Sequence, residues 1–300
     1  MTIRKQYRPY LLIAPATIIL MIIALYPFVY ALQLSLYRWE MGQAVEAKKF
    51  IGVLNYIKAL LSSDFWTALG TTAVYTAATV VVEFGLGLAV ALLLNGEFVG
   101  RSVVRSIAII PLAVTPVVVG LVWRVLYNTD YGLINFILHE LGLPTSKWIA
   151  GMSTALISVV IVDIWQCTPF ATLILLAGLQ TVPIDVLEAS KIDGASGLQR
   201  FRYVTLAFLR TPILVVLLFR TIDSFKVFDN IYALTMGGPG SATETLSMHL
   251  YIQGFRNRHM GYASAMGILF LIVVTLICQL FIRVIDNQGT SSNDGSRTRR

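Results

Sequence analysis

A run of 27 residues without a charged side chain, residues 11–37, constrains this chain more than any other feature. As a helix it would extend about 40 Å, whereas the hydrocarbon core of a bilayer is roughly 30 Å thick. The run is too long for the apolar core of a signal peptide, and no small-residue cleavage site follows in the expected place. We therefore expect a retained first membrane span.

Further long apolar stretches follow, each with at most a few charges. Hydrophobic residues make up 56% of the chain and charged residues 13%, against about 25% charged residues in soluble domains. The sequence therefore predicts an all-α polytopic membrane protein with six transmembrane helices. The five later spans are expected at residues 65–96, 106–128, 151–179, 211–235 and 261–282.

Basic residues indicate the orientation of these spans. Thirteen Lys and Arg side chains fall on the side that holds both termini, and eight fall in the other loops. Because cytoplasmic segments carry an excess of basic residues, we expect a cytoplasmic N-terminus at residues 1–10, a six-span membrane domain at 11–285 and a disordered cytoplasmic tail at 286–300. The basic residues are spread among tails and loops, so no nucleic-acid surface is indicated.

Small residues and prolines mark two spans. Gly85 and Gly87, followed by two alanines, allow a neighbouring helix to pack closely against the second span. Pro111 and Pro116 should kink or break the third span, which membranes tolerate when neighbours satisfy the freed carbonyl groups. A short helix near residues 133–141 is expected in the loop that follows.

Four charges lie three residues apart in the fifth span: Arg220, Asp223, Lys226 and Asp229. Neighbours at this spacing can touch, so we expect two ion pairs, Arg220 with Asp223 and Lys226 with Asp229. Charges at membrane depth are costly unless they face a wet cavity or partner helices. The charges either hold the helix bundle together or form a polar wall of a solute pathway, to which Asn230 would add hydrogen-bonding groups.

A second polar cluster in the fourth span consists of Asp163, Trp165 and Gln166, shortly before Pro169, where we expect a kink. An aromatic face with carboxylate and amide groups is a composition suited to binding sugars. The alternative is that Trp165 packs and Asp163 is a paired structural charge. Glu83, the only charge of the second span, ranks below these candidates.

Several kinds of chemistry are not indicated. No lysine follows a glycine, so the phosphate-binding loop of ATPases is absent and we expect no ATP site on this chain. The three histidines lack zinc-protease spacing, and the two cysteines lie in apolar runs without metal spacing. We expect no catalytic residues, no metal and no cofactor bound by the chain itself.

The most ordered polar stretch is the loop of residues 182–210, between the fourth and fifth spans. Pro183 suits the first turn of a helix, and Asp185 suits the positive end of its dipole. Gly194 should end that helix, because glycine readily adopts positive φ. The loop therefore predicts two short helices around a glycine turn, or, more plainly, an ordinary amphipathic loop.

The same loop carries the spacing of a known family. Residues 188–194 read EASKIDG, and nine residues later comes VTL at 204–206. This resembles the EAA loop of permeases of binding-protein-dependent ABC importers, in the carbohydrate branch of maltose and glycerol-phosphate type. It departs at Ser190, Val204 and Ala207, where the family has alanine, isoleucine and proline. The similarity covers roughly residues 10–285.

The resemblance implies a transport subunit of the prokaryotic inner membrane that works by alternating access and imports a sugar, with trehalose or maltose as examples. It implies a second permease chain, two ATPase subunits that bind ATP and Mg²⁺, and an extracytoplasmic solute-binding protein. In the family this loop is cytoplasmic and docks on the ATPase. The coupling residues it assigns are Glu188, Ala189, Ser190, Asp193 and Gly194.

Two alternatives remain from the residues alone. An ion-coupled secondary transporter could use Asp163 or the charges of the fifth span and would need no ATPase. A membrane enzyme could use the carboxylates of the fifth span as acid and base and would form a product without any partner. The EAA spacing argues against both.

Overall fold

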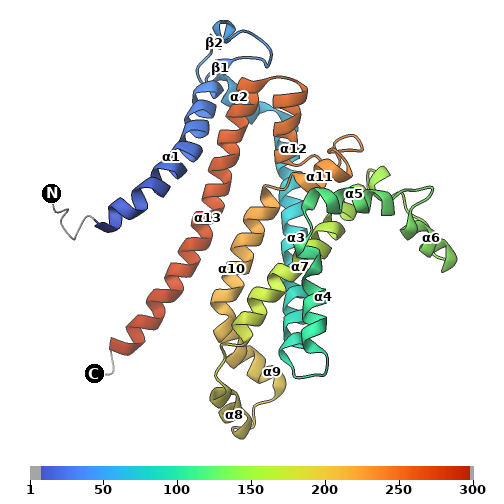
Figure 1. The fold of residues 1–300 in the computed structure, drawn as a ribbon, viewed down its shortest axis with the longest axis vertical. Helices are drawn as coiled ribbons and strands as arrows, with labels where there is room; N and C mark the ends of the chain where they lie inside the picture. The colour runs from blue at the N-terminus through green and yellow to red at the C-terminus, as the bar shows by residue number, and fades with distance from the viewer. Residues whose placement is uncertain (1–7, 298–300) are drawn as a thin grey trace. The chain divides into compact units, whose positions relative to one another are not determined.

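The computed structural model describes the backbone of residues 8–297 and the side chains of residues 13–283. The chain divides into two compact units, the first made of residues 1–66 and 250–272 and the second of residues 67–249 and 273–300. Nearly all of the described residues lie in helices or in the turns between them (Figure 1). Of the expected cytoplasmic N-terminus at residues 1–10, residues 1–7 lie outside the described residues.

The first unit contains the long helix α1, a two-stranded antiparallel sheet that pairs Tyr37 with Phe50 and Arg38 with Lys49, and a short helix α2. Residues 250–272 add the end of α12, a turn of π-helix and the first part of α13. The elements are α1 (Arg8–Ser35), β1 (Tyr37–Arg38), η2 (Val45–Ala47), β2 (Lys49–Phe50), α2 (Leu54–Leu61), η5 (Ile252–Arg256) and α13 (Met260–Arg297).

The second unit holds most of the helices. In Figure 1, α3, α4, α7 and α10 run alongside one another, and α8 and α9 lie at the lower end of α10. The elements are α3 (Ser63–Asn95), α4 (Arg101–Ala113), α5 (Pro116–Leu126), α6 (Leu133–Glu140), η3 (Trp148–Ala150), α7 (Ala155–Leu179), α8 (Ile184–Ile192), α9 (Gly197–Arg200), η4 (Phe201–Thr205), α10 (Leu206–Phe225), α11 (Asp229–Leu234) and α12 (Leu246–Tyr251).

Five helical segments of the described residues are long and apolar enough to cross a membrane, and α4 with α5 passes the same test as one bent pair. This confirms the prediction of an all-α polytopic membrane protein. The count matches the predicted six if the bent pair is one span. The five are Ile13–Ser35, Ser63–Asn95, Ala155–Leu179, Gly197–Phe225 and Met260–Arg283.

The third span is broken, as its prolines predicted. Helix α4 ends at Ala113, α5 begins at Pro116, and the two helices meet at 95°. Pro116 occupies the first position of α5, where its missing N–H leaves no hydrogen bond unmade. By contrast, α7 continues without interruption through Pro169.

The core of the second unit lies between α3, α7 and α10, where leucines from all three helices are fully buried. Small residues bring these helices close together. A Cβ atom added to Gly87 would lie 2.6 Å from the Cβ of Ala171, and one added to Gly178 would lie 2.6 Å from Cγ of Pro212. The expected close packing of the second span is therefore confirmed at Gly87, while Gly85 faces open space.

The fifth span differs from the single helix expected at residues 211–235. Helix α10 ends at Phe225, three residues connect it to α11, and α11 begins at Asp229. The charges at Lys226 and Asp229 therefore lie at a break, where they reach a polar environment. Helix α13 extends to Arg297, and the disordered cytoplasmic tail at residues 286–300 stays a prediction.

Candidate functional site

A pocket of about 380 Å³, lined by both charged and apolar side chains, lies in the second unit, where the α4–α5 break meets α7, the end of α10 and the start of α11. Seven of the eight predicted pathway residues line it, although they come from three separate helices and a connection. The lining residues are Leu112, Val114, Pro116, Asp163, Gln166, Cys167, Arg220, Asp223, Lys226, Val227, Phe228, Asp229 and Asn230.

The most buried feature of this pocket is an ion triad centred on Arg220. Its Nε lies 2.5 Å from Oε2 of Glu83, and its Nη2 lies 2.9 Å from Oε1 of Glu83 and 2.9 Å from Oδ2 of Asp163. Glu83 is fully buried, and Asp163 and Arg220 are each 5% exposed. The guanidinium therefore ties α3, α7 and α10 together at a single point.

This triad corrects the expected pairing of Arg220 with Asp223. A guanidinium prefers the paired oxygens of a carboxylate in its own plane, and Glu83 on the neighbouring helix α3 offers both. Ser224 accepts a further hydrogen bond from Arg220 at 3.1 Å, and Thr79 donates to Ser224 at 3.1 Å. These contacts fit the first of the two roles considered for the charges of the fifth span, in which Arg220 holds the helix bundle together.

Asp223 instead pairs with Lys226, whose Nζ lies 2.9 Å from its Oδ1. Both side chains are about half exposed, so solvent weakens the pair. The expected pair of Lys226 with Asp229 is not formed, because α10 ends before Lys226 and the two residues no longer share a helix. Asp229 opens α11 and lines the pocket.

Two amides bridge the broken span to the rest of the pocket. Gln166 donates from Nε2 to the carbonyl oxygen of Val114 at 3.0 Å, and its Oε1 accepts from Nδ2 of Asn230 at 3.1 Å. Oδ1 of Asn230 is buried and has no hydrogen-bond partner among the described residues. A buried acceptor without a donor is unfavourable, and this oxygen is closed off from solvent in this structure.

Trp165 lies apart from the other predicted residues. Its side chain is 43% exposed, and its ring packs edge-on against Trp123 with 5.7 Å between centroids. It does not line the pocket. The packing interpretation of Trp165 therefore fits this structure.

Glu83, which the sequence ranked below the other candidates, is the residue that pairs with Arg220 through both carboxylate oxygens. Its signal was present, because it is the only charge in a long apolar span, but nothing local showed its partner. Its carboxylate, that of Asp163 and the thiol of Cys167 have ligand atoms within 4.8 Å of one another. Arg220 holds both carboxylates, so a metal ion at this place would have to displace the guanidinium.

The loop after α7 confirms the predicted helix and glycine turn. Helix α8 runs from Ile184 to Ile192, and Gly194 follows with φ of +77°. Pro183 lies one residue earlier than expected, at the N-cap. Ser196 and Gln199 then form a capping box that starts α9, which satisfies two free backbone donors.

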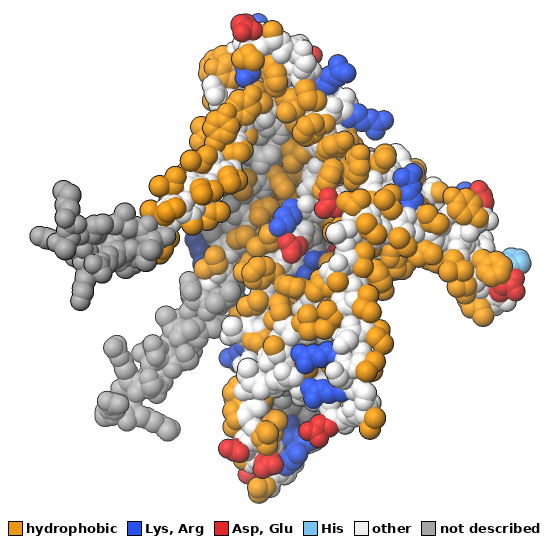
Figure 2. Space-filling view, in the orientation of Figure 1, with side chains coloured by type: hydrophobic (Ala, Val, Ile, Leu, Met, Phe, Trp, Pro, Cys, Tyr) orange, Lys and Arg blue, Asp and Glu red, His pale blue; other side chains and the backbone are white. Residues whose placement is uncertain are grey.

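The predicted coupling residues are presented to solvent, except one. Glu188, Ala189, Asp193 and Gly194 are exposed, whereas Ser190 is 9% exposed and donates to the carbonyl oxygen of Leu187 at 2.7 Å. Charged side chains gather over α8 and α9 in Figure 2. Large apolar side chains are also exposed on this loop and on the helix start that follows: Ile184, Ile192, Leu198 and Tyr203.

One helical segment joins this loop to the pocket. Helix α9, the π-helical turn η4 and α10 follow one another without a break, over the 29 residues Gly197–Phe225. The segment begins beside the exposed loop, carries Arg220 in its last turns and ends next to Lys226 in the pocket wall.

Residues 83–288 match the family model described as the binding-protein-dependent transport system inner membrane component. This stretch contains both the pocket and the exposed loop. The chain belongs to this family. The prediction of a permease, made from the EAA spacing, is therefore confirmed. So is the prediction of a multi-pass component of the inner membrane.

The permease has named relatives over almost its whole length. It is 38% identical over 288 residues to the trehalose/maltose transport system permease protein MalF of Thermococcus litoralis, which covers 95% of this chain and 97% of the relative. It is 37% identical over 275 residues to the trehalose transport system permease protein SugA of Mycobacterium tuberculosis, over 92% and 87% of the two chains.

A solved structure shares the fold of the permease. A chain of a bacterial ABC transporter that imports alginate superposes with a TM-score of 0.79 at 22% identity, over 92% of this chain and 95% of that one. The same kind of transporter has also been solved with an alginate pentasaccharide-bound periplasmic protein. The likeness confirms the predicted class of fold.

Proposed function

We propose that this permease is the membrane subunit of an ATP-driven sugar importer of the prokaryotic cytoplasmic membrane, with both termini and the α8–α9 loop in the cytoplasm. The chain has no ATP site of its own in this proposal. ATP and Mg²⁺ bind to two partner ATPase subunits, and a solute-binding protein delivers the sugar from outside. Family membership and the sugar-transporting relatives support this assignment.

The observation that carries the proposal is the unbroken helical segment Gly197–Phe225 between the exposed loop and the pocket. At 1.5 Å per residue such a segment extends about 40 Å. A displacement of the loop therefore reaches the pocket wall through continuous helix. The permease would alternate between an inward-facing and an outward-facing state. Closure of the ATPase dimer shifts the equilibrium between them only as far as the ATPase binds one state more tightly than the other.

The loop has the chemistry of a docking surface. Glu188 offers an exposed carboxylate to a basic group of the ATPase, and Gly194 permits the turn that closes α8. Ile192 is 86% exposed, and burial of such a side chain against a partner contributes roughly 1.5–3 kcal/mol. Ser190 acts inside the loop, where it bonds Leu187, and is not a contact to the partner.

The pocket is the part of the sugar pathway that this chain supplies. Asp229 presents a carboxylate, the Lys226–Asp223 pair forms a polar rim, and Asn230 lies in the same wall. Hydroxyl groups of a disaccharide such as trehalose or maltose donate to these acceptors. Arg220 and Asp163 hold the wall by their ion triad instead of binding the sugar. A second permease, a different chain, would complete the pathway.

The test is reconstitution in proteoliposomes with the second permease, the ATPase subunits and the solute-binding protein, with radiolabelled trehalose and maltose outside. Wild-type complexes should take up one of the sugars only with ATP inside. The variant Glu188→Lys should reach the membrane, lose ATPase binding and lose uptake. The matched control is Glu140→Lys, a charge reversal at another exposed glutamate, on α6 and outside the loop, and it should keep uptake.

Two outcomes would contradict the proposal. Uptake by Glu188→Lys at the wild-type rate would remove Glu188 from coupling. Uptake without ATP that follows a proton or sodium gradient would identify an ion-coupled transporter instead.

A further inference from the structure

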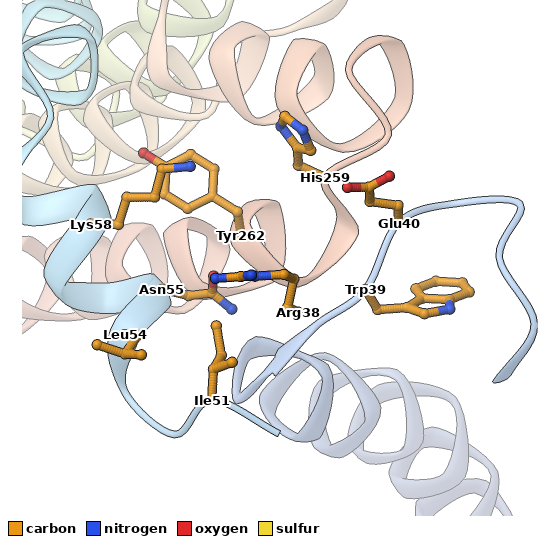
Figure 3. A pocket seen from close by; sticks show the side chains of 9 residues that line it. All are labelled: Arg38, Trp39, Glu40, Ile51, Leu54, Asn55, Lys58, His259 and Tyr262. Carbon is orange, nitrogen blue, oxygen red and sulfur yellow. The ribbon is translucent and has the colours of Figure 1, made fainter. Parts of the chain in front are cut away.

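A second pocket, of about 340 Å³, lies in the first unit and shares no lining residue with the pocket of the second unit. Residues around β1, the start of α2 and the start of α13 form it (Figure 3). In this view the indole of Trp39 points away from the other lining side chains, and Arg38 extends toward Asn55. The lining residues are Arg38, Trp39, Glu40, Ile51, Leu54, Asn55, Lys58, His259 and Tyr262.

Two cations in this pocket have no ion-pair partner. Neither Arg38 nor Lys58 lies within ion-pair distance of a carboxylate among the described residues. Lys58 Nζ lies 4.8 Å from the ring centroid of Tyr262, which fixes the ammonium group over the ring. The one carboxylate of the lining, Glu40, accepts a hydrogen bond from Gln43 at 3.2 Å. The pocket therefore carries a net positive charge.

The backbone around the pocket is held firmly. Asn55 is 6% exposed and donates to the carbonyl oxygens of Ser35 and Tyr37 at 2.8 and 3.0 Å. The amide of Gly261 donates to Trp39 at 3.2 Å. A Cβ atom at Gly261 would collide with the carbonyl oxygen of Tyr37, so only glycine allows this approach. The site is therefore built before any ligand arrives.

The pocket lies where two apolar spans end. The span Ile13–Ser35 stops just before β1, and the span Met260–Arg283 begins one residue after His259. Tyr37, Trp39 and Tyr262 cluster at this level, and tyrosine and tryptophan are enriched where membranes meet water. The depth of the pocket therefore corresponds to that of lipid headgroups.

Helix α2 presents an apolar stripe on the outer face of this unit. Leu54, Ile57 and Leu61 are 54%, 46% and 81% exposed, and their spacing of three and four residues places them on one side of the helix. The opposite side carries the buried Asn55 and Ala59. An amphipathic helix with such a face lies along a bilayer surface with its apolar side among the acyl chains.

We propose that this pocket binds an anionic phospholipid through its phosphodiester group. Arg38 and Lys58 contact the phosphate oxygens, since a guanidinium matches phosphate geometry and a lysine supplies a second charge. The acyl chains continue along the exposed leucine and isoleucine side chains of α2. The apolar stripe beside the cations favours a lipid over a free phosphate or an acidic protein segment, because neither of these would cover it.

The test uses the full-length chain with its accompanying subunits, purified in mild detergent, delipidated and titrated with phosphatidylglycerol. Native mass spectrometry counts bound lipid. Removal of a charged hydrogen-bond partner costs about 1.5–3 kcal/mol, so Arg38→Ala with Lys58→Ala should weaken binding at least about tenfold. The charge-keeping variant Arg38→Lys with Lys58→Arg should retain most of the binding, which separates loss of the site from loss of folding.

The matched control removes one lysine and one arginine of the same unit outside the pocket, by Lys49→Ala with Arg256→Ala. Both side chains are exposed, and this variant should bind lipid as the wild type does. An equal loss in the control would show general surface attraction and overturn the proposal. Unchanged binding in the pocket variant would do the same.

Further measurements distinguish an anionic lipid from the other possible ligands of the pocket, a soluble phosphate compound or a protein. Phosphatidylcholine, whose ammonium group meets the same cations, should bind more weakly than phosphatidylglycerol. Competition by inorganic phosphate or glycerol phosphate at millimolar concentration would indicate a soluble phosphate ligand and overturn the lipid assignment. Loss of solute-binding-protein capture by the pocket variant, with lipid binding intact, would identify a protein-docking surface instead.

Discussion

The side-chain amide of Gln166 donates a hydrogen bond to the carbonyl oxygen of Val114, 3.0 Å away, between the end of α4 and the start of α5. The chain turns through 95° at this break, and the turn deprives carbonyl groups of their helical donors. Gln166 supplies one donor from the neighbouring helix α7. The irregular backbone at membrane depth is thereby tolerated where protein and the pocket surround it.

We expect Gln166→Leu to destabilise the permease. The substitution leaves the Val114 carbonyl oxygen and the Asn230 amide without partners, and each buried unsatisfied group costs about 1–3 kcal/mol. The apparent melting temperature of the detergent-solubilised protein should fall. Gln180→Leu, at an exposed position after α7, is the control and should leave the melting temperature nearly unchanged; an equal fall in both would contradict this role.

Arg220→Met should be more damaging, because it leaves two buried carboxylates without a cation. Breaking a buried ion pair on one side costs about 3–5 kcal/mol. Neutralising both partners as well, with Glu83→Gln and Asp163→Asn, should restore part of the lost melting temperature. The control, Lys226→Met, breaks a half-exposed pair worth about 0–1 kcal/mol. If the triple variant is no more stable than Arg220→Met, the triad is not the cause.

Substitution by alanine should affect the stability of the protein differently at Gly178 and at Gly85. Gly178→Ala places a Cβ atom 2.6 Å from Pro212, and such overpacking costs about 1–3 kcal/mol. Gly85→Ala meets nothing within 4 Å and should be neutral or slightly stabilising, because alanine favours helix. Melting temperatures of the two variants measure the difference. Equal values would show that α7 and α10 separate easily.

The turn at Gly194 predicts a graded series in sugar uptake. Its φ of +77° is costly for alanine and still more so for valine, but asparagine tolerates this region. No neighbouring atom obstructs a side chain there, so backbone strain alone should decide. We expect uptake to follow glycine, asparagine, alanine, valine, with little change in melting temperature. Uptake independent of the residue would remove the turn from the coupling mechanism.

The sequence predicted features that depend on local chemistry. The apolar spans follow from the absence of charges, the break in the third span from Pro116, and the turn after α8 from Gly194. The pocket was predicted in outline, because seven of eight polar candidates line it. Trp165 was the exception, since a tryptophan near polar residues does not reveal which way it packs.

The pairing of charges could not be predicted from spacing. Arg220 has a carboxylate three residues away but binds Glu83, 137 residues away in sequence, and Asp163, 57 residues away. Local proximity on a helix is weak beside a buried bidentate contact. The pairing of Lys226 with Asp229 was also predicted wrongly. Because α10 ends at Phe225 and α11 begins at Asp229, the two residues are not neighbours on one helix.

The contact between Gly178 and Pro212 has a mechanical consequence. Gly178 lies one residue before the end of α7, just ahead of the loop of residues 182–210, and Pro212 lies in α10 just after it. The two flanking helices therefore meet without room for one methyl group. We therefore expect a force applied to α8 to act on the ends of α7 and α10 together, because these ends are already in contact.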